Sequence, residues 1–174
     1  MEKTEKFSFR FYFRALTSII REPGNFFRDL PPDMGLKLPA GFLCVSSFIH
    51  VAFGLAINMP SRPILLGGVF FINAVGMVFI AAALGYMLTV MFMKKRVPFA
   101  FFFSVYAFSS GVTLLASWLP FFIWLTEPWK WWLIGTGMIK AFGFRWTQAV
   151  LVIVVSFAVI ALFFLSVSPF VFPK

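Results

Sequence analysis

Apolar residues occupy most of the chain in long runs, and short stretches between the runs carry the charges. Four runs are long: residues 38–61, 64–93, 97–126 and 146–173. None of them contains Asp, Glu, Lys or Arg. A helix that crosses a bilayer needs roughly 20 predominantly apolar residues, so each run predicts a membrane-spanning helix.

A shorter apolar piece, residues 128–139, lies between the third and fourth long runs. One interpretation keeps residues 120–145 outside the membrane, which leaves four spans. The other starts a short additional helix near Thr126, a good N-cap residue, with Pro128 in the first turn. Tryptophans at the start of this piece and Lys140 at its end are typical of the two membrane interfaces.

The basic residues indicate the orientation of the runs. Seven Lys or Arg residues precede the first run, and a basic triplet at 94–96 follows the second. With five spans, the two sides of the membrane hold 12 and 3 basic residues, and with four spans they hold 11 and 4. Because cytoplasmic loops are enriched in Lys and Arg, both counts predict a cytoplasmic N-terminus, and five spans fit slightly better.

The N-terminal segment has the pattern of an interfacial helix. Placed on a helix, four apolar side chains gather on one side and three arginines on another. The apolar set is Phe9, Phe13, Leu16 and Ile20, and the basic set is Arg10, Arg14 and Arg21. Such a helix lies in the headgroup plane or packs on the protein's own cytoplasmic face, and both alternatives place it at the interface. Pro23 and Gly24 end it, and residues 25–30 form a second short turn.

The composition supports the same class. The 174 residues are 61% hydrophobic and 12% charged, about half the charged fraction of a soluble domain. This excludes a soluble enzyme and a soluble nucleic-acid-binding protein. The net charge of +9 comes from cations that flank apolar runs, which favours attraction to anionic headgroups over nucleic acid. A single cysteine, Cys44, excludes an internal disulfide.

We therefore predict an all-α protein: a polytopic transmembrane helical bundle with five spans, or alternatively four, preceded by an amphipathic interfacial helix. Residues 1–37 form the interfacial segment and residues 38–174 the membrane domain. The expected location is a prokaryotic cytoplasmic (inner) membrane. The expected partners are the lipid bilayer, a protein in the membrane or further copies of the chain, and not nucleic acid.

Polar residues inside the runs are the candidates for function, because burying a polar group in a membrane is costly. His50 is the sole histidine, and Glu127 is the only acid beyond the N-terminal region. Neither has the partners that an acid–base pair, a triad or a metal site needs, so we expect no catalytic residue, metal or cofactor. The candidate polar cluster within the membrane is His50, Ser46, Asn73, Ser110, Thr113 and Ser117. It lines a hydrophilic groove, or it serves close helix packing.

The second run carries a regular pattern of small residues. Gly67, Ala74 and Ala81 recur every seven residues, and Gly85 follows four residues after Ala81. Small residues at such spacings let two membrane helices approach closely. These four residues are the candidate packing face, which places this helix centrally in the bundle or at a self-association surface.

Three segments resemble a known family, the Yip-domain (Ypt/Rab-interacting) integral membrane proteins. Residues 23–30, which read PGNFFRDL, are similar to its P-x-x-F-F-x-x-L opening, and residues 106–115 to its Y-A-x-x-P-x-L-L segment. Residues 131–149 resemble its short fourth span, glycine turn and fifth span. Gly111 stands where the family often has proline, and the D-L-Y-G-P motif of eukaryotic members is missing, which argues against binding of a Rab-type GTPase.

The resemblance implies a five-span bundle with a cytoplasmic N-terminus and no enzymatic activity. The expected function is that of a membrane scaffold or interaction component. The alternative is a small transporter, channel or lipid-handling protein, assembled as a homo-oligomer. The alternative requires the polar cluster to line a cavity, whereas the scaffold predicts that helices cover it.

Overall fold

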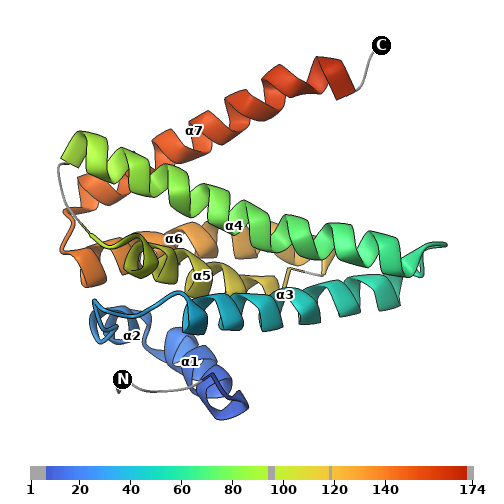
Figure 1. Ribbon diagram of the computed structural model, residues 1–174, viewed down its shortest axis with the longest axis horizontal. Helices are drawn as coiled ribbons and strands as arrows, with labels where there is room; N and C mark the ends of the chain where they lie inside the picture. Colours follow the sequence, from blue (N-terminus) through green and yellow to red (C-terminus); the bar gives the residue numbers. More distant parts are fainter. Residues whose placement is uncertain (1–6, 94–96, 118, 172–174) are drawn as a thin grey trace.

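The computed structural model describes residues 7–93, 97–117 and 119–171, and these residues form helices and no strand (Figure 1). The predicted all-α class is thus confirmed for the described part of the chain. The basic triplet at 94–96 and the last residues of the fourth run lie outside it. The elements are α1 (Phe9–Arg21), α2 (Pro23–Arg28), α3 (Lys37–Asn58), α4 (Pro63–Met93), α5 (Phe99–Leu114), the 3-10 helix η1 (Pro120–Phe122), α6 (Ile123–Phe142) and α7 (Trp146–Val171).

Two helices, α3 and α4, are clearly long and apolar enough to cross a membrane. They coincide with the first two predicted runs, because neither run contains a charge or an internal break. The helix α5 and residues Trp146–Leu162 of α7 are apolar but shorter. The helix α6 has 20 residues, and it contains Glu127, Lys130 and Lys140.

The third run is not one helix, so the prediction of a single element over residues 97–126 is wrong. The helix α5 ends at Leu114, and a 3-10 turn at Pro120 leads into α6. Proline has no N–H to continue a helix and its ring clashes with the preceding turn, which explains the break. Because α6 begins at Ile123, Thr126 is not its N-cap, and Pro128 lies in its interior.

A glycine ends α6 and lets the chain reverse direction. Gly143 adopts a left-handed conformation with φ of +63°, which glycine reaches at little cost. The N–H of Gly143 donates to the carbonyl of Ile139 at 3.1 Å, the bond of an αL cap. The last helix, α7, starts two residues later, at Trp146.

The helices α3 to α7 run in alternating directions, and α5 lies at the centre (Figure 1). The helix α5 contacts α1, α3, α4 and α6. In contrast, α7 contacts α4 and α6 near its start, and its C-terminal part leaves the bundle (Figure 1). Other helices therefore surround α5 on every side, whereas α4 and α7 each have one side that no helix of this chain covers.

The N-terminal helix α1 packs on the bundle through a side that the sequence pattern did not single out. Its buried residues are Phe11, Tyr12, Ala15 and Ile19. Two members of the predicted apolar stripe, Phe9 and Phe13, remain 77% and 60% exposed. The helix therefore has two apolar sides, one against the protein and one free to enter the membrane interface, and its basic side lies opposite them.

Candidate functional site

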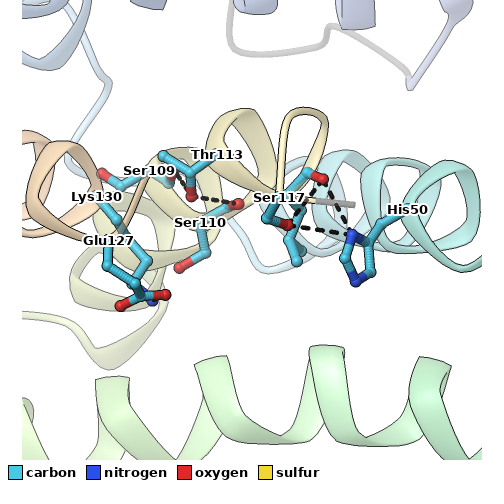
Figure 2. Close-up of polar contacts among 8 residues, drawn as sticks. His50, Ser109, Ser110, Thr113, Ser117, Glu127 and Lys130 are labelled. Atoms are coloured by element: carbon cyan, nitrogen blue, oxygen red, sulfur yellow. Dashed lines mark hydrogen bonds and ion pairs between the residues drawn. The ribbon is translucent and has the colours of Figure 1, made fainter. Parts of the chain in front are cut away.

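The sole histidine lies at the end of α5 and satisfies its last carbonyl. The Nδ1 atom of His50, on α3, is 3.2 Å from the carbonyl oxygen of Leu114 and 3.1 Å from the hydroxyl of Ser117. The Ser117 hydroxyl also donates to the Leu114 carbonyl, at 3.1 Å. Figure 2 shows the His50 ring and the Ser117 hydroxyl facing each other. Because the last carbonyls of a helix lack partners within it, this arrangement acts as a side-chain cap.

The other hydroxyl-bearing residues of α5 are buried; Ser104 and Thr113 bond to their own helix, whereas the Ser109 hydroxyl has no hydrogen-bond partner among the described residues. Ser110 and Thr113 are 5% and 3% exposed. The Thr113 hydroxyl donates to the carbonyl of Ser110 at 3.0 Å (Figure 2). The Ser104 hydroxyl donates to the carbonyl of Phe101 at 2.7 Å. Hydroxyls turned back to the backbone in this way are typical of packed membrane helices rather than of a wetted groove.

Ser46 and His50 lie one turn apart on α3, but their side chains bond to different helices. The Ser46 hydroxyl meets the hydroxyl of Tyr12 on α1, at 3.0 Å. Burial raises the pKa of the Tyr12 phenol, and the hydrogen bond to Ser46 opposes that shift. Beside this pair, a Cβ atom on Gly111 would lie 2.7 Å from the Phe42 ring and 3.3 Å from the Ser46 oxygen. The glycine therefore lets α3 and α5 approach closely where α1 docks.

The structure divides the predicted polar cluster into separate sites. His50 and Ser117 form one, Ser46 belongs to the docking site of α1, and Ser110 and Thr113 lie inside α5. Asn73 lies apart from all of them, on the exposed side of α4. The division follows from the helix positions, because helical spacing alone does not determine which neighbour each side meets.

The candidate packing face of α4 points toward helices of the same chain at two of its members. A Cβ atom on Gly67 would lie 2.9 Å from the Leu55 side chain on α3, and one on Gly85 would clash with the hydroxyl of Tyr106 on α5. Ala74 and Ala81, between them, are half-buried. Close approach at this face thus serves the single chain.

A buried polar contact that the sequence analysis missed lies beside Gly85. The hydroxyls of Tyr106 on α5 and Ser156 on α7 approach each other, but they do not reach hydrogen-bonding geometry. Both side chains are 1% exposed. The sequence does contain a signal for this contact, a tyrosine in the middle of an apolar run. A buried phenol normally requires a hydrogen-bond partner.

The one acid beyond the N-terminal region pairs with a neighbour at the surface. Glu127 forms a salt bridge with Lys130, one turn along α6, with the Nζ and Oε1 atoms 2.5 Å apart (Figure 2). Between α6 and α7, Glu127 borders an apolar groove of about 510 Å³ that Trp124, Trp131 and Phe157 line. Within the described residues, no group of His, Cys, Asp and Glu side chains is arranged to hold a metal ion.

The segments that resemble a family meet in the core. Phe26, from the PGNFFRDL segment, packs edge-on against Phe108 of the second segment, with ring centroids 5.1 Å apart. Its neighbour Phe27 is fully buried, and a Cβ atom on Gly137 of the third segment would lie 3.3 Å from it. Residues 17–168 match the Yip1 domain. The chain belongs to the Yip1 domain family.

The match covers α2 to α6 entirely, together with the end of α1 from Thr17 and most of α7. The comparison with curated proteins and with solved structures finds no match to either. Membership of the Yip1 domain family therefore identifies a membrane protein of Yip type. Within this chain, the residues that carry the resemblance are packing residues that join α2, α5 and α6.

Proposed function

We propose that this chain is a non-enzymatic, five-span membrane protein that acts as a scaffold or interaction component, with its N-terminus in the cytoplasm. The alternating directions of α3 to α7 support five spans (Figure 1). Lys37, Lys140 and Arg145 lie at one end of these helices, Arg62 lies at the other, and Lys130 lies in the first half of α6, toward that other end. With the basic triplet of the sequence at 94–96, this distribution agrees with a cytoplasmic N-terminus in an inner membrane.

The observation that carries the proposal is the burial of the α5 hydroxyls. A solute pathway needs polar groups that face a space, whereas Ser104 and Thr113 donate to carbonyls of their own helix. A catalytic role for His50 would need an orienting carboxylate or a free nucleophile. Its Nδ1 atom instead contacts the Leu114 carbonyl and the Ser117 hydroxyl, which is a structural use of the ring.

The test is purification of the full chain at native expression, in mild detergent and in nanodiscs, with mass spectrometry of bound proteins and lipids. We expect one protein partner at a fixed stoichiometry. An unrelated tagged membrane protein from the same cells is the control. His50→Ala should leave recovery of the partner unchanged, because the ring only caps α5. Loss of the partner in this variant, or its absence from the wild type, would count against the scaffold.

One observation favours the alternative of lipid handling. The groove between α6 and α7 is apolar, with a volume of about 510 Å³, and Glu127, which forms an ion pair with Lys130, lies at its border. A specific lipid that co-purifies with the wild type and is lost in Phe157→Ala would favour this function. The matched control is Leu151→Ala, which removes an exposed side chain of α7 outside this groove.

A further inference from the structure

The outward side of α4 is an uncovered surface in the middle of the membrane. The helix has 31 residues, about 46 Å at 1.5 Å per residue, and five of them are buried. Its neighbours α3, α5 and α7 occupy one side. The other side faces lipid or a partner.

A single amide interrupts this surface. The polar side chains of α4 are Asn73, Tyr86 and Thr89, and of these Asn73 is exposed. It makes no hydrogen bond to the described residues. It lies ten residues after the start of α4, about 15 Å along the axis, which is within the hydrocarbon core. Polar groups at that depth normally face another helix, because lipid offers no hydrogen bond.

The residues in line with Asn73 have the spacing of a helix–helix seam. Steps of four and three residues alternate along Val69, Asn73, Gly76, Ile80, Ala83, Met87 and Val90. The large members Val69, Ile80 and Met87 are 52–56% exposed and Val90 is 39% exposed, so no helix of this chain covers the large side chains of the seam. Such a heptad places apolar knobs toward a partner helix, and a single Asn in it selects register and oligomeric state.

Gly76, in this seam, is not needed for any close helix contact within the chain. A Cβ atom there would meet nothing within 4 Å. Glycine is unfavourable in the interior of a helix, but it lets a second helix approach closely. Ala83, seven residues later, presents the same narrow profile.

We propose that a second copy of this chain covers the seam, so that α4 packs in parallel against α4 about a two-fold axis normal to the membrane. Copies that share one topology can be related only by such an axis, which brings Asn73 opposite Asn73. An amide carries both a donor and an acceptor, so two facing amides complement each other. This inference goes beyond the proposed scaffold role and does not depend on it.

The first experiment is cysteine cross-linking of the full chain in native membranes, in a Cys44→Ser background. Ile80→Cys lies in the seam and is expected to form a disulfide-linked dimer on mild oxidation. Phe70→Cys is equally exposed but lies on a different side of α4, and it is expected to stay monomeric. Equal cross-linking at both positions, or none at Ile80→Cys, overturns the proposal. So does a cross-link from Ile80→Cys to a different protein.

The second experiment measures the dimer by energy transfer between labelled copies in liposomes. Asn73→Leu should weaken the dimer about three- to thirtyfold, the range for one hydrogen bond between membrane helices. Gly76→Ile should weaken it further by holding the helices apart. Gly68→Ile is the matched control, since a Cβ atom there also meets nothing within 4 Å but lies outside the seam.

The outcomes separate this inference from the scaffold proposal. A dimer that is weakened in Asn73→Leu and Gly76→Ile but unchanged in Gly68→Ile supports the α4 seam, whether or not another protein co-purifies. A monomeric wild type, or a dimer whose affinity is unchanged in both seam variants, overturns it. Recovery of a different partner protein by that monomer would leave the scaffold role standing.

Discussion

The helices α5 and α4 have similarly apolar sequences and very different surroundings. In α5, 13 of 16 residues are buried, whereas in α4 the number is 5 of 31. Hydropathy does not distinguish the two, because a residue facing lipid and a residue facing protein are equally apolar in a membrane. The difference comes from position: α5 has helices on every side, and α4 has them on one.

The surroundings of α5 also explain why aromatic residues gather there. Phe108 lies within ring contact of Phe11, Phe26 and Phe42, with centroid distances of 6.4, 5.1 and 5.2 Å. These rings come from α1, α2 and α3, so one side chain joins three elements. On the outward side of α4, the large apolar residues have no comparable contacts, and substitutions there should matter little to folding.

The largest expected effect comes from removing the shared ring. Phe108→Ala should lower the free energy of unfolding by about 3–5 kcal/mol, because the cavity would lie among rings of three other helices. Ile72→Ala on α4, where the side chain is 72% exposed, should change it by less than about 0.5 kcal/mol. Unfolding by denaturant in mixed micelles measures both. Equal losses would contradict the assignment of the core to α5.

An intermediate effect is expected where helices approach most closely. Gly111→Val should cost about 1–3 kcal/mol, because the new side chain would strike the Phe42 ring. Gly68→Val on α4 enters open space, and it should cost only what the change in helix propensity requires. Thermal unfolding of the two variants side by side decides the comparison. A stable Gly111→Val protein would mean that α3 and α5 are further apart.

The smallest expected effect is at the docking site of α1. Tyr12→Phe and Ser46→Ala should each cost about 0.5–1.5 kcal/mol, the net value of one hydrogen bond. Because both variants break the same bond, the double variant should cost less than the two losses added together. Trypsin cleavage at Arg10 and Arg14 reports release of the helix. Fully additive losses would show that the two hydroxyls do not interact.

Predictions from the sequence succeeded where a pattern is local. The bounds of α3 and α4 follow from uninterrupted apolar runs, and α1 follows from its amphipathic spacing. The start of α6 was wrong, because Thr126 and Pro128 are good start signals but Pro120 breaks the chain first. Rules based on local sequence do not decide which of two helix-start signals is used when both lie within ten residues.

The candidate site was less accessible to sequence reasoning. Ser46 and His50 share one helix, yet they meet Tyr12 and Ser117, which lie 34 and 67 residues away in the sequence. Likewise, the sequence around Tyr106 and Gly111 does not indicate that the Tyr106 side chain points toward α7 and that Gly111 lies against Phe42 of α3. Each assignment depends on which helix lies opposite, and that requires the packed bundle.

The sequence by itself determined that this protein is helical, that it belongs in a membrane and which end carries the basic charge. These properties are sums over many residues, so single errors do not alter them. Only the tertiary structure decided that α5 is the central helix, that α1 docks through Tyr12 and that Asn73 faces outward. The physical reason is that lipid and protein interiors favour the same apolar side chains. Which residues are buried therefore depends on the neighbouring helices rather than on hydropathy.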